Sequence, residues 1–531
     1  MASPQLAGPV RERSEGAWQH LFAISPDRPS YKWWVALTVM LSAFIVVMSS
    51  ATVSVALPPI MTAFGLNIDE AQWIVTAYMI AGAVLIPTVG WLGNRLGNRN
   101  VFLISLAVFV VGSALCSFAW SSTSLILFRV VQGIGSGPIM PMALVILNSS
   151  FPPRQRGLAM GLYGLGVSFG PAFGPVLGGY VTEYLSWRVV FSVNVIPGII
   201  GMLLVMLVLP NNRESVQRSF DLAGLLCLSV FLVSLLSALS QGHRYGWDAP
   251  IIQRLFVIGG LAFVLFLALE LWKEEPLVEV ALYRDPAFAA VSIAGLGVAM
   301  AFWGTGFLQT ILLQRLMGYT PAQAGLVQLP GALSMGISTL IAGRLADKFD
   351  RRYIVWTGLA LFALASYSFS FLTLDQPIGW VTWMIMVRYI TIGFVFTPMN
   401  AASMVLLPPE KVRMGSGILT LIQHGVGGTL GVALMTTVLQ RRSVQHTVAL
   451  DEQQAFSSLA WHDAVTPAWE LMNQVGEVGT MAETKAWALV GRHLAQQGMV
   501  AAYQDCFLVL AIICLAVMPF MWFLRRYRGS P

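Results

Sequence analysis

The sequence predicts an all-α polytopic membrane protein, in which fourteen transmembrane helices form two pseudo-symmetric six-helix bundles plus two inserted helices. Its 531 residues are 56% hydrophobic and 11% charged, whereas soluble proteins carry about 25% charged residues. Fourteen apolar segments are long enough to cross a bilayer, which takes about 20 residues. Three sequence patterns of the first half also recur in the second half, which indicates a duplicated bundle.

Each spanning segment is expected to be a helix, because lipid offers the backbone no hydrogen-bond partners and these runs are too long for barrel strands. The predicted spans are 33–56, 72–93, 100–120, 124–148, 157–183, 189–210, 221–241, 255–272, 286–312, 321–343, 353–373, 378–403, 414–439 and 502–524. The predicted parts of the chain are an N-terminal tail 1–32, a first bundle 33–210, a linker with the two extra helices 211–285, a second bundle 286–525 and a C-terminal tail 526–531.

The internal repeat consists of three matches in the same order and at nearly one shift. GWLGNRLGNR at 90–99 corresponds to GRLADKFDRR at 343–352, FRVVQGIGSGPIMP at 128–141 to VRYITIGFVFTPMN at 387–400, and FPPRQRGLAMG at 151–161 to LPPEKVRMGSG at 407–417. Spans 1–6 therefore resemble spans 9–14. In transporters built from two such repeats, the substrate site lies between the halves.

Basic residues predict which side of the membrane each loop faces. Cytoplasmic loops carry an excess of Lys and Arg, and with the N-terminus inside about two thirds of the 31 Lys and Arg fall on that side. The number of spans is even, so we expect both termini in the cytoplasm. The stretch before the first span lacks the apolar core of a signal peptide, which predicts an uncleaved anchor. A net charge of +6 matches loops that face an anionic leaflet, and no nucleic-acid partner is expected.

One outer loop is long, over 440–501, and carries many acidic residues. Its segments 466–476 and 481–497 mix apolar and polar residues at near-helical spacing. Two interpretations are open: a surface loop with some helix, or a docking element for a partner outside the membrane.

Residues that bind metals or carry out catalysis are scattered. The four cysteines lie in or beside apolar runs, and neither they nor the histidines of the loops show the spacing of a metal site. No G-x-x-x-x-G-K-[ST] sequence, which cradles nucleotide phosphates, occurs. We therefore expect no metal, no cofactor, no enzymatic activity and no ATP-driven transport.

Five motifs spread over the chain carry a family resemblance. They are GWLGNRLGNR at 90–99, RVVQGIGSGPIMP at 129–141, GVSFGPAFGPVLGG at 166–179, SWRVVFSVNVIPG at 186–198 and GYTPAQAGLVQLP at 318–330. The first two resemble a loop motif and a fourth-helix motif of the major facilitator superfamily, and the third resembles its fifth-helix antiporter motif. Together they most closely resemble the fourteen-helix drug:proton antiporters of the EmrB/QacA type.

The resemblance implies the major facilitator fold and a secondary active exporter of drugs or other lipophilic compounds. It implies alternating access, proton antiport and a place in the bacterial cytoplasmic (inner) membrane, in contact with membrane lipids. Similar proteins with a long last loop work with a periplasmic adaptor protein and an outer-membrane channel, which implies such partners here.

This sequence departs from the family where the family carries acids. The usual carboxylate of the first span is Ser49, the nearby asparagine position is Ser54, and the loop motif has Asn94 instead of aspartate. The residue that would couple protons is therefore open. A proton-independent facilitator, or a permease for lipids or anionic compounds with the same fold, is the alternative.

Two arginines lie within predicted spans, where insertion of each costs at least about 2.5 kcal/mol. Arg129 must therefore face the protein interior or water, and Gln132 lies on the same helix face. Arg388 is the counterpart of Arg129 in the repeat. No span has an acid in its middle, so His424 is the candidate proton carrier.

The antiporter-like motif predicts a helix that packs tightly. Small residues every four positions line one face, where a neighbouring backbone can approach closely, and two prolines are expected to bend the helix. This helix is a candidate seal or pivot between the halves. Its residues are Gly166, Gly170, Pro171, Gly174, Pro175, Gly178 and Gly179.

The two copies of the loop motif are candidate gating loops, in which basic residues follow a tight glycine turn. Asp347 could pair there with Lys348, Arg351 or the N-terminus of a facing helix. Such contacts would stabilise one gating state. The candidate residues are Gly90, Asn94, Arg95, Gly97 and Arg99 in the first copy, and Gly343, Asp347 and Arg351 in the second.

The expected substrate cavity is largely apolar. Without a central acid, the fixed charges of Arg129 and Arg388 favour neutral or anionic lipophilic cargo over cationic drugs. The candidate lining residues are Trp73, Tyr78, Phe302, Trp303, Phe307 and Met399.

Overall fold

The computed structural model describes residues 28, 30–66, 68–210, 221–273, 278–374, 376–407, 411–453, 459–477 and 479–523. Most of the predicted N-terminal tail, residues 211–220 of the linker and the C-terminal tail lie outside the described residues. Within them there are fourteen helical segments long and apolar enough to cross a membrane and no strand. The predicted all-α class and the number of spans are confirmed.

The first bundle begins at Tyr31 and ends at Val208. Its helices are α2 (Tyr31–Phe64), α3 (Ile68–Leu85), α4 (Val89–Leu96), α5 (Asn98–Ser117), α6 (Ser122–Ser150), α7 (Arg156–Tyr184), α8 (Val189–Ser192) and α9 (Val195–Val208). The turn η1 (Ile86–Thr88) joins α3 to α4 within one span. A capping box fixes the start of α6, where the hydroxyl of Ser121 accepts from the backbone N–H of Ser124 at 3.1 Å.

The second bundle repeats this plan after two inserted helices, α10 (Leu222–Tyr245) and α11 (Pro250–Trp272). Its helices are α12 (Pro286–Ile311), α13 (Pro321–Lys348), α14 (Arg351–Ser368), α15 (Ile378–Leu406), α16 (Val412–Thr420), α17 (Gly428–Gln453) and α19 (Thr480–Val517). A π-helix, η7 (Leu421–Gly427), joins α16 to α17. The short turns η5 (Phe369–Phe371) and η8 (Met518–Phe523) follow α14 and α19.

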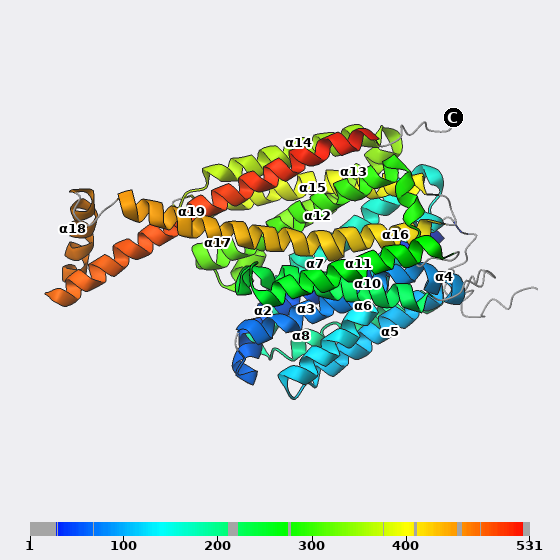
Figure 1. The fold of residues 1–531 in the computed structure, drawn as a ribbon, viewed down its shortest axis with the longest axis horizontal. Coiled ribbons are helices and arrows are strands. Elements are labelled where there is room, and N and C mark those ends of the chain that lie inside the picture. Colours follow the sequence, from blue (N-terminus) through cyan, green and yellow to red (C-terminus); the bar gives the residue numbers. More distant parts are fainter. Residues whose placement is uncertain are drawn as a thin grey trace, which may run out of the picture.

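The long loop predicted at 440–501 is mainly helical where it is described. Helix α17 continues to Gln453, α18 spans Leu459–Gln474, and α19 already begins at Thr480. Together they form a projection, here called the hairpin, at the left of Figure 1. The opposite end of the bundles, here called the terminal end, carries Tyr31, whose hydroxyl donates to the backbone O of Val208 at 2.9 Å.

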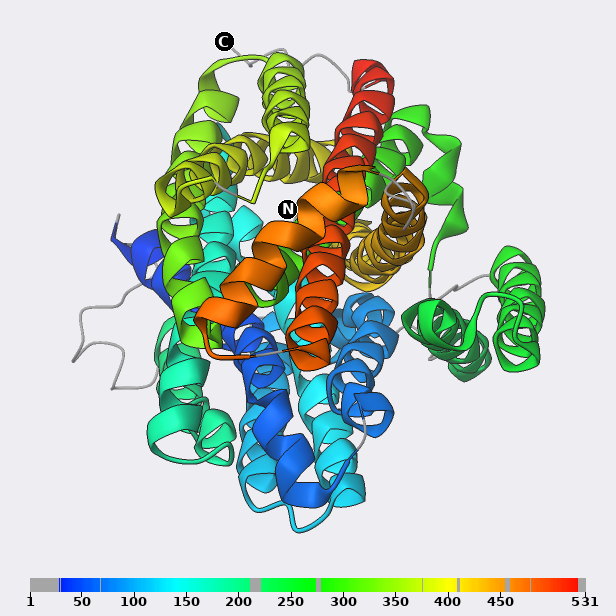
Figure 2. The same ribbon diagram turned by 90° about the vertical axis from the view of Figure 1, so that its left-hand side faces the viewer.

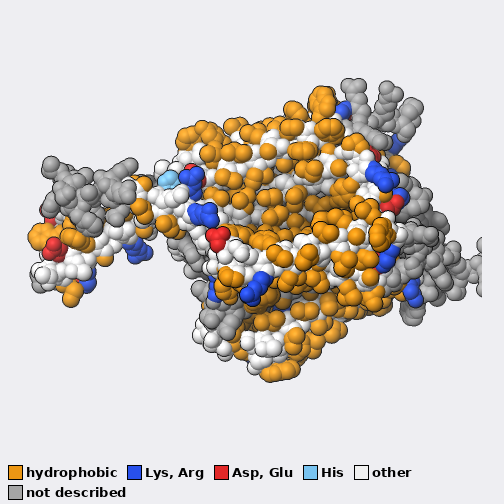
Figure 3. Space-filling model, viewed as in Figure 1, with side chains coloured by type: hydrophobic (Ala, Val, Ile, Leu, Met, Phe, Trp, Pro, Cys, Tyr) orange, Lys and Arg blue, Asp and Glu red, His pale blue; other side chains and the backbone are white. Residues whose placement is uncertain are grey.

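The two bundles pack side by side, each around its own apolar core. Helices α7 and α13 meet along most of their length and form the main contact between the bundles. The inserted helices α10 and α11 pack on each other at one edge, at the right of Figure 2, where α10 also touches α3 and α17. On the face seen in Figure 3, hydrophobic side chains cover the middle, and Lys and Arg gather toward its two ends, as expected for a bilayer-spanning protein.

Candidate functional site

A cavity of about 110 Å³ lies between the bundles. Its wall comes from α2, α3, η1 and α6 of the first bundle and from α12, α16 and η7 of the second. The wall is mostly apolar and contains no carboxylate. Its residues are Val46, Val47, Ser50, Tyr78, Met79, Gly82, Ala83, Ile86, Ser136, Gly137, Met140, Trp303, Thr420, His424 and Gly425.

The bundles are in close contact at the terminal end. The carboxylate of Asp347, at the end of α13, accepts from the backbone N–H of Gly157 at 2.7 Å and of Leu158 at 3.0 Å. Both donors lie in the first turn of α7, where N–H groups are unpaired within the helix and a negative charge is favoured by the helix dipole. Of the three possible partners of Asp347, the structure therefore shows the facing helix N-terminus.

Two glycines allow this approach. A Cβ atom on Gly343 would lie 2.3 Å from the backbone O of Gly157, and one on Gly157 would lie 2.3 Å from the backbone O of Gly343. The interface between the two bundles is here called the seam. Where α4 meets α16 on this seam the contact is looser, since a Cβ on Gly90 would lie 3.5 Å from the Cα of Met414. The strongest bundle-to-bundle contact at the terminal end is thus the crossing of α7 and α13.

The basic residues of the two candidate gating loops contact their own bundles. Arg99 donates to the backbone O of Met206 at 2.7 Å, and the guanidinium of Arg95 lies 5.1 Å from the ring centre of Trp91. Arg351 is buried and donates to the backbone O of Ala346 and of Ala401, at 3.2 and 3.0 Å. Gly97 adopts a positive φ of 82° between α4 and α5, which is the tight turn predicted at this position. Asn94 lies near the end of α4.

Arg129 is fully buried within the first bundle and forms the centre of a hydrogen-bond network. Its Nε donates to the backbone O of Ile74 at 2.9 Å, and its Nη1 donates to Oε1 of Gln132 at 2.6 Å. Gln132 then donates through Nε2 to the hydroxyls of Ser49 at 3.1 Å and Ser113 at 2.7 Å. The network joins α2, α3, α5 and α6, and Ser49 takes part in it as a neutral group.

Tyr78 separates Arg129 from the cavity. The Arg129 guanidinium lies 4.1 Å from the centre of the Tyr78 ring, which lines the cavity. The positive charge of Arg129 therefore lies directly behind the Tyr78 side chain and does not itself line the cavity. A fixed charge at this depth acts on a cavity occupant through the electric field, because a low-dielectric interior screens it weakly.

His424 lies in the cavity wall, within the π-helix η7. Its ring is 6.0 Å from the ring of Trp303, which faces it from α12. A π-turn widens the helix by one residue, and such turns frequently occur at functional sites. Among the described residues, the indole Nε1 of Trp303 has no acceptor, which leaves it as a donor in the wall.

The glycine stripe of α7 packs against α2 in the same bundle. A Cβ on Gly170 would lie 2.6 Å from the side chain of Val47, and one on Gly174 would lie 2.5 Å from Ala51; Gly166 and Gly178 are close to α2 in the same way. Gly179 instead approaches Ala322 at the start of α13. Helix α7 continues through Pro171 and Pro175. Helix α7 thus packs with one face against α2 of its own bundle and with another against α13 of the second bundle.

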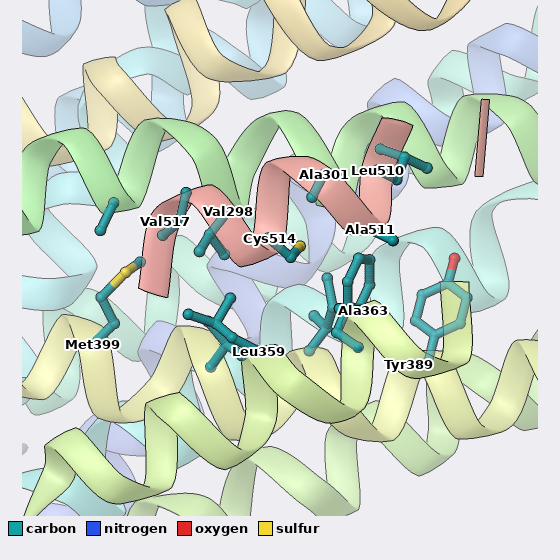
Figure 4. Packing of buried hydrophobic residues seen from close by; sticks show 14 of the residues in the cluster. Val298, Ala301, Leu359, Ala363, Tyr389, Met399, Leu510, Ala511, Cys514 and Val517 are labelled. Carbon is teal, nitrogen blue, oxygen red and sulfur yellow. The ribbon is translucent and has the colours of Figure 1, made fainter. Parts of the chain in front are cut away.

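Several predicted lining residues lie elsewhere. Trp73 is 38% exposed and outside the cavity wall. Ser54, at the family's asparagine position, is also outside the wall; it is exposed and donates to the backbone O of Ser50. Phe302 and Phe307 are half-buried against the core of the second bundle. Met399 is fully buried in that core, at one end of the cluster in Figure 4. For Phe302, Phe307 and Met399 the reason is helix rotation, because these side chains lie on the faces that α12 and α15 turn toward their own bundle.

Sequence reasoning also missed part of the wall. Ser50, Gly82, Ser136 and Thr420 lie in the wall, but each is a small residue in an apolar helix, like many others that only pack against a neighbour. The sequence did offer one signal. Ser49 on α2 and Gln132 on α6 are polar residues within apolar helices, and such a pair indicates the faces by which the two helices meet inside the bundle.

Arg388 lies outside the cavity, in the core of the second bundle, and is 1% exposed. Its guanidinium carbon is 4.5 Å from the ring centre of Phe369 and 4.7 Å from that of Phe507. In the described part of the chain, no group of three His, Cys, Asp or Glu could hold a metal ion.

Comparison with known proteins agrees with this architecture. The family model described as Major Facilitator Superfamily matches residues 39–432. The chain is 28% identical to the multidrug export protein EmrB of Escherichia coli strain K12, over 93% of this chain and 96% of that protein. It is also 28% identical to the fatty acid resistance protein FarB of Neisseria gonorrhoeae, over 92% and 95%. The crystal structure of the human organic anion transporter MFSD10 shares the fold, with a TM-score of 0.57, 13% identity, and coverage of 93% and 100%.

Proposed function

We propose, from the premise that this chain belongs to the Major Facilitator Superfamily, that it is a secondary exporter of lipophilic compounds working by alternating access. One observation carries the proposal: a cavity walled by both bundles lies beside a seam held closed at the terminal end by Asp347 on the N-terminus of α7. Drug-sized ligands occupy pockets of about 300–1,000 Å³. Since the cavity is smaller, cargo entry requires the bundles to separate.

The wall favours neutral or anionic lipophiles. It offers apolar side chains, the indole N–H of Trp303 and no carboxylate, with the charge of Arg129 behind Tyr78. A cationic cargo would meet repulsion without a counter-charge. The name of the relative FarB, a fatty acid resistance protein, supports an amphipathic anion as one cargo class.

For energy coupling we propose proton antiport, with His424 as the titrating group. It lies in the wall, in an irregular helix turn next to Trp303, and histidine changes charge near neutral pH. The alternative is a proton-independent facilitator or anion permease, which the neutral Ser49 in the Arg129 network favours. Substituting Ser49→Asp tests this point: under the alternative, it changes the transport rate or the cargo charge preference.

We further propose that the terminal end faces the cytoplasm of a bacterial cell and that the hairpin projects outward to meet a periplasmic adaptor. Apolar side chains on the hairpin, such as Trp469, Val475 and Trp487, are 43%, 72% and 42% exposed. We propose these side chains as part of the adaptor contact, because contiguous exposed apolar patches mark protein–protein interaction sites. Deletion of 450–495 that leaves whole-cell efflux intact would contradict the adaptor.

The exporter proposal is tested by filling the cavity. We expect Ser50→Trp, in the wall on α2, to lower lipophile efflux from cells and from proteoliposomes by at least roughly tenfold, which corresponds to about 1.4 kcal/mol. The matched control is Ile104→Trp on α5, whose side chain is 50% exposed. Equal transport by both variants would remove the cavity from the transport path.

The coupling proposal needs a separate measurement. Efflux by purified protein in proteoliposomes is recorded with and without an imposed pH gradient, for wild type and His424→Gln. We expect the gradient to accelerate wild-type efflux and to have little effect on the variant. Wild-type transport that ignores the gradient would leave the exporter in place but establish the uncoupled alternative.

A further inference from the structure

The second bundle contains a buried positive charge without a partner. Arg388 is 1% exposed, and none of its three guanidinium nitrogens has a hydrogen-bond acceptor among the described residues. Its nearest groups include the rings of Phe369 and Phe507. Ring faces attract a desolvated cation by about 2 kcal/mol or more, but they do not accept its five N–H bonds in the plane of the group.

The first bundle shows what is missing. There the counterpart Arg129 donates to the backbone O of Ile74 and to Oε1 of Gln132. In the repeat, the residue that corresponds to Gln132 is Thr391, three positions after Arg388. Its hydroxyl donates to the backbone O of Arg388 in its own helix, at 2.7 Å. No described residue of the second bundle therefore accepts from Arg388 as Gln132 accepts from Arg129.

Further polar groups of the same bundle are unsatisfied. Ser366, which corresponds to Ser113 by the shift that relates Gly90 to Gly343, is fully buried, and its hydroxyl has no partner in the described residues. It lies three residues before Phe369, on the helix face that reaches the Arg388 contact. On α12, the amide of Gln309 is fully buried with neither its oxygen nor its nitrogen paired there.

Among the described residues, no carboxylate pairs with Arg388 either. The carboxylate of Asp347 is engaged at the α7 N-terminus, that of Asp350 pairs with Arg352 at 2.9 Å, and that of Asp505 accepts from His446 at 2.8 Å. An uncompensated buried ion costs several kcal/mol even after relaxation. Water could accept the N–H bonds of Arg388 but would not neutralise its charge.

We propose that Arg388 holds a small monovalent inorganic anion, with chloride as the probe, inside the second bundle. The guanidinium supplies the charge, and the hydroxyl of Ser366 is an additional donor. The site is distinct from the cargo cavity, since neither Arg388 nor the rings it touches line that cavity. The bound anion acts as a resident counter-ion that stabilises the helices around α15.

The test measures chloride binding to the purified full-length protein in detergent, without transport. Radioactive chloride is titrated at constant ionic strength against gluconate, and thermal unfolding is followed under the same conditions. We expect saturable binding of about one chloride per chain and a rise of the unfolding temperature that saturates with it, because a ligand that binds only the folded state stabilises it.

Three variants locate the site. Arg388→Met is expected to abolish both binding and the chloride-dependent rise. Thr391→Gln, which supplies the internal acceptor of the first bundle, should weaken chloride binding at least roughly tenfold, about 1.4 kcal/mol, in a protein that still folds. Arg129→Met, the counterpart in the other bundle, should leave binding unchanged.

The proposal is overturned if the wild type shows no saturable chloride binding, which would mean that water alone fills the site. It is equally overturned if chloride binds Arg388→Met and Thr391→Gln as tightly as the wild type, or if only Arg129→Met loses it. Each of these outcomes leaves the exporter proposal intact, because transport is not measured.

Discussion

The two bundles place the same kind of residue at corresponding positions in different surroundings. In the first bundle, Arg129 is hydrogen-bonded to Gln132 and lies directly behind the cavity wall. In the second bundle, Arg388 lies among aromatic rings away from the cavity. The duplication thus preserves the buried charge while its connections differ. Under the proposals above, Arg129 acts on the cavity through its electric field, whereas Arg388 holds an anion.

The two candidate gating loops also differ in their contacts. Asp347 of the second loop spans the seam to α7, whereas its counterpart in the first loop is the neutral Asn94. Gly343 meets Gly157 far more closely than Gly90 meets Met414. Closure at the terminal end therefore depends mainly on the crossing of α7 and α13. Matched substitutions at corresponding positions of the two bundles should therefore have unequal effects on closure at the terminal end or on stability.

The largest effect is expected from Gly343→Ala. Its Cβ would lie 2.3 Å from the backbone O of Gly157, and such overpacking costs roughly 1–3 kcal/mol, or roughly 5–150-fold in the closed population. A cysteine at Ser50 would then be labelled faster by a thiol reagent applied from the terminal side. The counterpart Gly90→Ala should change labelling by no more than roughly twofold. Equal effects at both glycines would contradict the asymmetry.

A second comparison removes the side chains next to the two arginines. Gln132→Leu leaves Nη1 of Arg129 and the hydroxyls of Ser49 and Ser113 without this partner, at a cost of roughly 1–3 kcal/mol. Thr391→Val removes only a hydroxyl bonded within its own helix, so its cost should stay below about 1 kcal/mol. Thermal unfolding in detergent measures both, and a larger loss for Thr391→Val would reverse the comparison.

The smallest expected effect comes from Asp347→Asn, which makes the two loops alike at this position. The amide oxygen can accept from only one of the two N–H groups of α7 that Asp347 now pairs with. One hydrogen bond and the charge at the helix N-terminus are therefore lost, at roughly 1–2 kcal/mol together. Labelling at Ser50→Cys from the terminal side should rise modestly. Asp350→Asn is the matched control, because Asp350 caps α14 within its own bundle, with Oδ1 accepting from the backbone N–H of Arg352 at 3.1 Å. An equal rise in the control would assign the effect to general destabilisation.

Much of this architecture could be predicted from the sequence, because apolar length fixes each span and the repeat fixes the two bundles. The contact between Arg129 and Gln132 could be predicted because residues three positions apart lie on the same helix face. The partner of Asp347 did not, since sequence left three choices and only the packing of α7 against α13 selects one. Met399 was placed wrongly in the wall because the rotation of α15 is set by its neighbours. The π-turn at His424 has no recognised sequence signal.

Helix α19 runs for 38 residues without interruption, from Thr480 to Val517, or about 57 Å at 1.5 Å per residue. The hydrocarbon layer is only about 30 Å thick, so nearly half of the length of α19 extends beyond it. Phe507, which touches Arg388, belongs to the same helix. A partner bound at the tip of the hairpin would therefore contact a helix of the second bundle directly. A displacement of that tip would move the same helix where it packs beside Arg388.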